Sequence, residues 1–273
     1  MGPDDSEIEA LFQKINKMGF EGVEIPTFDG NLDSTRIRSL LSSSELVPIV
    51  IGGGSAETDL SSESALVQRN GQSYIKRLID LCRNIGGDLV VGPLYGPVGE
   101  KRLLSESECS KAMASLAREF KDIGKYARDR SVRLALEPLC RYDTHLLNTV
   151  AQARKLIDEI DNENVGLLLD TFHLNIEEKS FQKAIELAGN KLFHFHACEN
   201  NRGTPGSGLV NWQEVKKALD TLNYNGWIAI ESFVPNRGQF SAAMNTWRSF
   251  QPTQDEIASD GLNYLKRLLA PER

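Results

Sequence analysis

The sequence has no long apolar run and no cluster of basic residues, and each absence excludes a class of protein. No apolar stretch approaches the roughly 18 consecutive residues that a membrane-spanning helix needs, so the sequence predicts no membrane partner. No run of five Lys or Arg residues occurs, and the formal net charge is -7. Because duplex nucleic acid is bound through a basic surface, we expect no nucleic-acid partner either.

Cysteine is scarce and scattered in this sequence. The four cysteines lie far apart and none belongs to a Cys-x-x-Cys pair, so neither a zinc knuckle nor a redox pair is predicted. The first residues include Asp4 and Asp5, where a signal peptide would carry Lys or Arg. We therefore expect a cytoplasmic protein whose thiols are reduced and mostly buried.

The remaining composition is that of an ordinary globular protein, with 40% hydrophobic and 25% charged residues in 273. Short apolar segments predict seven strands, at 21–26, 46–51, 87–92, 132–137, 164–170, 191–196 and 226–233. Between and after them, helical patterns occur at 5–18, 33–43, 64–85, 105–130, 149–161, 180–188, 211–223 and 254–269. Alternation of helices with strands too apolar to face water predicts an α/β protein with a parallel sheet covered by helices.

Eight helices and seven strands predict a (β/α)8 TIM barrel that forms a single domain over residues 1–273. The chain opens directly in a helix, and the few polar residues before that helix are unsuited to a buried strand. We therefore expect a barrel whose first strand is not in this sequence.

Polar residues end four consecutive predicted strands. In a barrel, the carboxyl ends of the strands meet at one face and carry the reactive groups, which here are Glu137, Asp170, His196 and Glu231. Three carboxylates close together repel one another unless a cation neutralises them. Oxygen ligands with one imidazole suit Mn2+, Co2+ or Mg2+ better than a structural zinc, although Zn2+ is also compatible. Taken singly, each acid has a helix cap or a salt bridge as its simpler interpretation.

Two further histidines lie near these strand ends. We expect His194 to point to the opposite face of its strand from His196, as a packed, hydrogen-bonded residue, so that only His196 reaches the barrel mouth. His173 lies three residues after Asp170, and we place it in the loop after the strand, where it could polarise a bound oxygen or cap a helix. A loop rich in Gly, Pro and charge follows over residues 197–208 and is interpreted as a substrate loop.

Four segments carry a resemblance to a known family: Leu136 to Asp143, Leu169 to Glu178, His194 to Arg202 and Ile230 to Phe233. In order and content they resemble the D-tagatose 3-epimerase family of xylose-isomerase-like TIM barrels. The resemblance covers essentially the whole chain apart from the first strand.

The resemblance implies a site in residue-by-residue detail. It implies Mn2+ or Co2+ held by Glu137, Asp170, His196 and Glu231, with His173 and Arg202 contacting the sugar. Glu137 and Glu231 would lie on opposite sides of C3 of the sugar and serve as both metal ligand and acid or base. Asp143 stands where many relatives have Glu, so its contact to a sugar hydroxyl and the substrate preference stay open.

The function implied is that of an isomerase, a divalent-metal-dependent epimerase that inverts C3 of free ketohexoses or ketopentoses. The reaction would proceed by proton abstraction through a metal-stabilised enediolate. Alternatives within the same superfamily are an aldose–ketose isomerase, a keto-glycoside epimerase and a keto-inositol dehydratase. A non-catalytic sugar-binding barrel is the alternative from another class. The resemblance also favours a homodimer or homotetramer.

Overall fold

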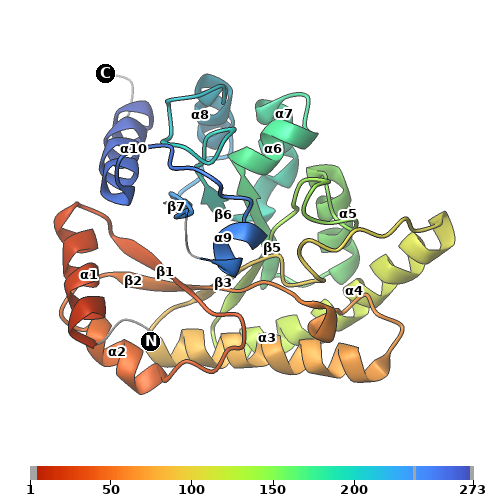
Figure 1. Ribbon diagram of the computed structural model, residues 1–273. Helices are drawn as coiled ribbons and strands as arrows, with labels where there is room; N and C mark the ends of the chain where they lie inside the picture. The colour runs from red at the N-terminus through yellow and green to blue at the C-terminus, as the bar shows by residue number, and fades with distance from the viewer. Residues whose placement is uncertain (1–4, 236–237, 271–273) are drawn as a thin grey trace. The chain divides into compact units, whose positions relative to one another are not determined.

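Parallel strands form the centre of the fold, which is described here by a computed structural model for residues 5–235 and 238–270 (Figure 1). In this part of the chain seven strands form one sheet, in which they follow their order in the sequence. They are β1 (Gly22–Pro26), β2 (Val47–Ile51), β3 (Leu89–Gly92), β4 (Arg133–Leu136), β5 (Val165–Asp170), β6 (Leu192–His196) and β7 (Trp227–Ala229). Each lies inside a segment predicted to be a strand, so the predicted α/β alternation is confirmed.

The predicted helices are also present. They are α1 (Asp5–Lys17), α2 (Ser34–Leu41), α3 (Ala65–Ile85), α4 (Glu106–Arg128), α5 (Val150–Ile160), α7 (Phe181–Ala188), α8 (Trp212–Thr221) and α10 (Gln254–Leu268). The sequence analysis missed two short helices, α6 (Thr171–Glu177) and α9 (Gln239–Ala243), and two 3-10 turns, at Ala56–Thr58 and Gly189–Lys191. Among the described residues, no helix has the length and apolar character needed to cross a bilayer.

The chain forms two compact units, each assembled from several segments. The first unit holds β1 to β4 and α1 to α4, and it ends with residues 155–166. The second holds residues 99–101, residues 138–154 and the chain from Leu167 onward. That last segment contains β5 from its third residue, β6, β7 and α6 to α10. The prediction of a single domain over residues 1–273 stays a prediction.

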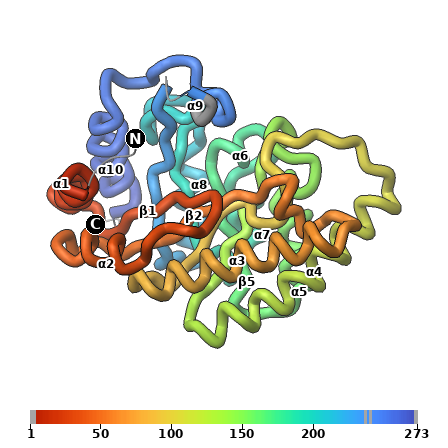
Figure 2. Tube along the Cα trace, turned by 60° about the horizontal axis from the view of Figure 1, so that its bottom comes forward, coloured from red at the N-terminus to blue at the C-terminus, as the bar shows by residue number. Residues whose placement is uncertain are grey.

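The core of the first unit lies between its strands and two long helices. Every residue of β3 is buried, and α3 and α4 pack side by side, as both views of the chain show (Figures 1 and 2). The helices bury residues at three- and four-residue spacing, such as Ile75, Leu78 and Ile79 in α3. Ser105 begins α4 with a capping box, in which its hydroxyl accepts from the Glu108 N–H and the Glu108 carboxylate accepts in return.

In the second unit, strand register brings polar residues to a common level. Strands β5 and β6 pair in parallel with Asp170 opposite His196, and β6 and β7 pair with His196 opposite Ala229. A shift in register between Leu167 and Leu168 precedes this alignment. The strands therefore end together, so that the residues at their carboxyl ends are neighbours.

Gly92 shows how closely the strand ends pack in the first unit. Its φ of 120° is in the region that favours glycine, and its carbonyl oxygen accepts the backbone N–H of Glu137 at 3.2 Å. A Cβ added at Gly92 would lie 2.1 Å from the carbonyl oxygen of Gly52. The absence of a side chain at Gly92 therefore allows its close approach to the Gly52 carbonyl, at the residue whose own carbonyl accepts the Glu137 N–H.

Gly92→Ala is expected to destabilise the protein far more than Gly86→Ala. Both glycines have positive φ, but a Cβ at Gly86 meets nothing within 4 Å. Gly86→Ala should therefore cost only the backbone penalty of about 1–2 kcal/mol, whereas Gly92→Ala adds a steric clash with backbone. Urea denaturation of the two variants measures the difference, and equal losses of unfolding free energy would contradict the role assigned to Gly92.

Candidate active site

The structure brings three of the four predicted metal ligands together in the second unit. Asp170 is the last residue of β5, His196 is the last residue of β6, and Glu231 follows β7 by two residues. The imidazole Nδ1 of His196 lies 3.9 Å from Asp170 Oδ2 and 3.8 Å from Glu231 Oε2. Asp170 and His196 are buried and Glu231 is partly buried, so these side chains converge in a site with little access to water.

Glu137, the fourth predicted ligand, occupies the position expected for it in the chain. It lies one residue beyond β4 and is 4% exposed. It is the last residue of its segment in the first unit. Its place beside the other three ligands stays a prediction.

The prediction for His194 is wrong in one respect. Side chains alternate along a strand, so residues two apart share a face and only adjacent residues point in opposite directions. The rings of His194 and His196 accordingly lie edge to face with their centroids 5.1 Å apart. Both are completely buried, so the prediction of a packed His194 is confirmed.

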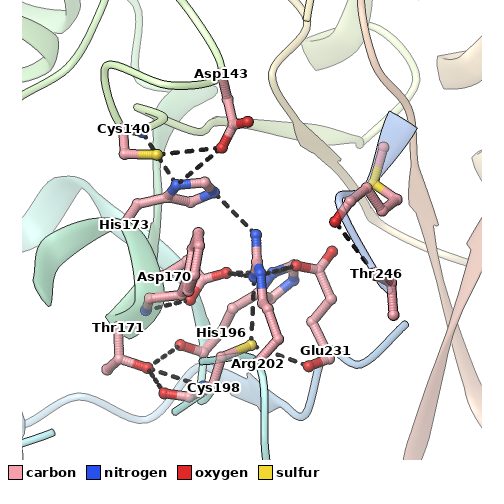
Figure 3. A network of polar contacts seen from close by, with 12 residues as sticks. Cys140, Asp143, Asp170, Thr171, His173, His196, Cys198, Arg202, Glu231 and Thr246 are labelled. Atoms are coloured by element: carbon pink, nitrogen blue, oxygen red, sulfur yellow. Dashed lines mark hydrogen bonds and ion pairs between the residues drawn. The ribbon is translucent and has the colours of Figure 1, made fainter. Parts of the chain in front are cut away.

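Arg202 is the cation at the centre of this cluster (Figure 3). Its Nη1 donates to Asp170 Oδ2 and, at 2.6 Å, to Glu231 Oε2. The guanidinium carbon also lies 4.1 Å from the centre of the Phe172 ring, a cation–π distance. One guanidinium thus neutralises two carboxylates that would otherwise repel each other.

Asp170 uses its two carboxylate oxygens for different purposes. Oδ1 accepts the Phe172 N–H at 2.7 Å and caps the start of α6, whereas Oδ2 faces Arg202 and His196. The simple interpretation as a helix cap and the functional one are therefore compatible. Burial raises the pKa of Asp170, but the nearby positive charge, Arg202 foremost, outweighs it and holds the pKa below its ordinary value. Asp170 is consequently an ionised carboxylate.

His173 lies in helix α6, not in a loop as the sequence analysis expected. Its Nδ1 accepts the backbone N–H of Cys140 at 3.0 Å, and its Nε2 lies 3.1 Å from Arg202 Nη2. Burial and the Arg202 charge lower the pKa of His173 to about 3, so the ring is neutral. Because Nδ1 is an acceptor, the single proton of the neutral ring is on Nε2. On that side Nε2 faces Arg202 Nη2, which is also a donor.

Asp143 lies on the other side of His173 (Figure 3). Its Oδ2 is 3.8 Å from His173 Nδ1 and accepts the thiol of Cys140 at 3.2 Å. Burial and then the Asp143 charge raise the pKa of Cys140 to about 12, so this thiol keeps its proton and donates. The structure thus places Asp143 beside a predicted sugar-contacting residue, and its own contact to a sugar stays a prediction.

Two residues that the sequence analysis did not single out hold the strand ends together. The Thr171 hydroxyl donates to the carbonyl of Cys198 at 2.6 Å and accepts the Cys198 N–H at 2.8 Å. The Cys198 thiol donates to the Glu231 carbonyl at 3.0 Å. Thr171 directly follows a predicted apolar strand and Cys198 lies two residues after His196, and these positions were the only sequence signal for them.

The donor set fits a divalent cation. Two ligands that are each about 2.1 Å from one ion lie no more than about 4.2 Å apart, and the separations of 3.8 and 3.9 Å from His196 Nδ1 fall within this limit. Cys198 also lies within reach of Asp170 and Glu231, but burial raises its pKa well above the ordinary thiol value. A protonated thiol is a poor ligand, so the carboxylates and the imidazole are the donors that could hold the ion.

Comparison with known proteins gives a consistent result. The family model described as xylose isomerase-like TIM barrel matches residues 12–268. A probable ketose 3-epimerase of Synechocystis sp. is 34% identical over 261 residues, covering 95% of this chain and 90% of that protein. The D-psicose 3-epimerase of Agrobacterium fabrum is 30% identical over 255 residues, covering 91% of this chain and 87% of that protein.

A solved structure agrees with these relatives in fold. The crystal structure of a D-psicose 3-epimerase in the presence of D-fructose superposes with a TM-score of 0.89 and 28% identity, covering 97% of this chain and 94% of that one. The predicted TIM-barrel fold is thereby confirmed, and the relatives named are epimerases, which are isomerase-class enzymes. The chain belongs to the xylose isomerase-like TIM barrel family.

Proposed function

We propose that this protein is a divalent-metal-dependent epimerase that inverts C3 of free ketoses. The observation that carries the proposal is the cluster of Asp170, His196 and Glu231 at neighbouring strand ends, with a neutral His173 beside it. The similarity to ketose and D-psicose 3-epimerases supports the reaction type. A sugar-binding protein without activity would have no need of a carboxylate placed to exchange a proton.

Four residues would hold the metal in this proposal: Glu137, Asp170, His196 and Glu231. Mn2+ or Co2+ is the proposed ion, because oxygen donors with one imidazole suit these metals. When bound, such an ion supplies positive charge that makes a proton next to a ketone more acidic. His196 is the one neutral donor, and its complete burial fixes its ring in the cluster.

Glu231 and Glu137 would move the proton. One carboxylate removes the proton from C3 and the other returns a proton to the opposite face, which inverts that carbon. In the reverse reaction the two roles exchange. Arg202 donates to Glu231 Oε2 at 2.6 Å and thus places a positive charge beside the carboxylate proposed to act as acid or base.

His173 and Arg202 would bind the sugar through its oxygens. The Nε2–H of neutral His173 can donate to the ketone oxygen, where negative charge develops as the proton leaves C3. Arg202 is able to donate to the same region through its second terminal nitrogen, Nη2. Asp143 would contact a sugar hydroxyl beyond His173, and because its side chain is short, we propose that it contributes to the choice among ketoses.

Deuterium exchange at C3 is the first expected result of this function. D-Psicose, D-fructose, D-tagatose and L-ribulose, incubated in D2O with the protein and Mn2+, should gain deuterium at C3 together with the C3 epimer, as followed by proton NMR. Removal of metal with a chelator should abolish the exchange and added Mn2+ should restore it. Exchange at C1 would indicate an aldose–ketose isomerase instead, and no exchange with stoichiometric metal binding would contradict the proposal.

Glu137→Gln and Glu231→Gln should each lower kcat by about 10²–10⁴-fold, the usual contribution of a general acid or base. The amides keep the size of the side chains but cannot accept a proton. Glu119→Gln is a matched control, because Glu119 is a buried carboxylate of α4 in the first unit. Steady-state kinetics with the best ketose measures the effect, and a kcat near that of the control for either variant would exclude that residue as an acid or base.

The free energy of unfolding of the metal-free protein should decrease as the pH falls from about 6.5 toward 3, because His173 is buried as a neutral ring. Its folded pKa of about 3 lies below the unfolded value of 6.5, so in this window the unfolded chain binds a proton that the folded chain does not. Stability is then lost with falling pH at up to about 1.4 kcal/mol per pH unit. Urea denaturation at several pH values should show a shallower dependence for His173→Gln, and an unchanged slope would refute the lowered pKa.

A further inference from the structure

Glu199 is a completely buried carboxylate that directly follows Cys198 in the loop before α8. Its side chain accepts from the indole Nε1 of Trp212 at 2.7 Å and from three backbone N–H groups, those of Gly206 at 2.8 Å, Val210 at 3.2 Å and Asn200 at 3.3 Å. All of these donors are neutral. A buried charge is costly unless hydrogen bonds satisfy it, and this one draws its donors from the whole length of the loop.

The same residue closes the turn that contains Arg202. The Arg202 N–H donates to the Glu199 carbonyl at 2.9 Å, and the Glu199 N–H donates to the Gly203 carbonyl at 3.4 Å. Within this turn Arg202 has a φ of 65°, a conformation that residues with a side chain rarely adopt. Surrounding contacts must therefore hold Arg202 in it, and they include the two backbone hydrogen bonds of Glu199 and the bond from the Gly203 N–H to Asn201 Oδ1 at 2.9 Å.

The conformation of this turn decides where the Arg202 guanidinium lies. From it, Nη1 reaches Glu231 Oε2 at 2.6 Å and Nη2 reaches His173 Nε2 at 3.1 Å. We propose that Glu199 is a positioning residue, which anchors the loop over residues 199–212 and thereby fixes Arg202 for contact with the sugar. This inference rests on the proposed function, in which Arg202 binds substrate.

The carboxylate form of Glu199 is required by its hydrogen bonds. Oε1 accepts from the Gly206 N–H and from Trp212, and Oε2 accepts from the Val210 and Asn200 N–H groups. In Glu199→Gln, either orientation of the amide places an NH2 group against two donors. At least two hydrogen bonds must break, although the size of the side chain is almost unchanged.

Glu199→Gln is expected to lower kcat/KM by about 10²-fold, the loss that a displacement of about 1 Å in a positioned group can cause. Glu119→Gln serves as the control, because Glu119 is also a buried carboxylate and accepts from Gln72 and Arg118 in the first unit. The control should change kcat/KM by less than about twofold, because Glu119 shares no hydrogen-bond partner with the second unit's cluster in the contacts described for it. Both variants are assayed in the presence of Mn2+, at a temperature well below that at which either variant unfolds.

Two readouts separate positioning from general destabilisation. If Glu199 acts through Arg202, adding Glu199→Gln to Arg202→Met should lower kcat/KM by less than about threefold further, because the two effects are not additive. Hydrogen exchange of the amides of residues 199–212 should be faster in Glu199→Gln than in the wild-type protein, and unchanged in Glu119→Gln. Amide hydrogen exchange therefore reports on the anchoring of this loop in the absence of sugar.

The outcomes distinguish this inference from the proposed function. A wild-type protein that exchanges no sugar hydrogen would overturn the proposed function, and the positioning role with it, while hydrogen exchange would still report whether Glu199 anchors the loop. An active wild-type protein with kcat/KM of Glu199→Gln close to that of the control would overturn the positioning role alone. Full additivity with Arg202→Met would also overturn it, because Glu199 would then act independently of Arg202.

Discussion

The second unit is organised around the repulsion between buried carboxylates. Asp170 ends β5 and Glu231 follows β7, with β6 between the two strands, and the parallel register brings these strand ends to one level. In a medium of low effective dielectric constant, two such charges need a cation between them. Arg202 supplies that charge from a loop, and His196 places its imidazole at the same level. Three features keep these groups in place: the cap that Asp170 makes on α6, the hydrogen bonds between Thr171 and Cys198, and the turn that contains Arg202.

Much of this arrangement could be predicted from the sequence because it follows from periodicity. The short apolar segments and the helical patterns are local signals, and each predicted strand and long helix is present. Asp170 and His196 could be named because each ends a strand. Glu231 lies two residues beyond the end of β7, and it could be named because it follows an apolar segment.

The features that the sequence analysis missed or mispredicted have physical explanations. Helix α6 begins immediately after β5, so Asp170 both ends a strand and caps a helix, and seven residues carry too little periodicity to be recognised. The orientation of His194 was wrongly predicted, although the alternation rule itself gives the right answer. Glu199 could not be identified, because its importance comes from donors up to 13 positions away in the chain.

The backbone contact to His173 has a consequence for how the site responds to its surroundings. In many active sites a histidine is oriented by a carboxylate, whose own ionisation then influences which nitrogen carries the proton. Here the amide of Cys140 takes that place, and a peptide N–H neither gains nor loses a proton in water. The hydrogen-bonding direction of His173 is therefore set by the course of the main chain after β4, and it is inherited with the fold at every pH at which the ring is neutral.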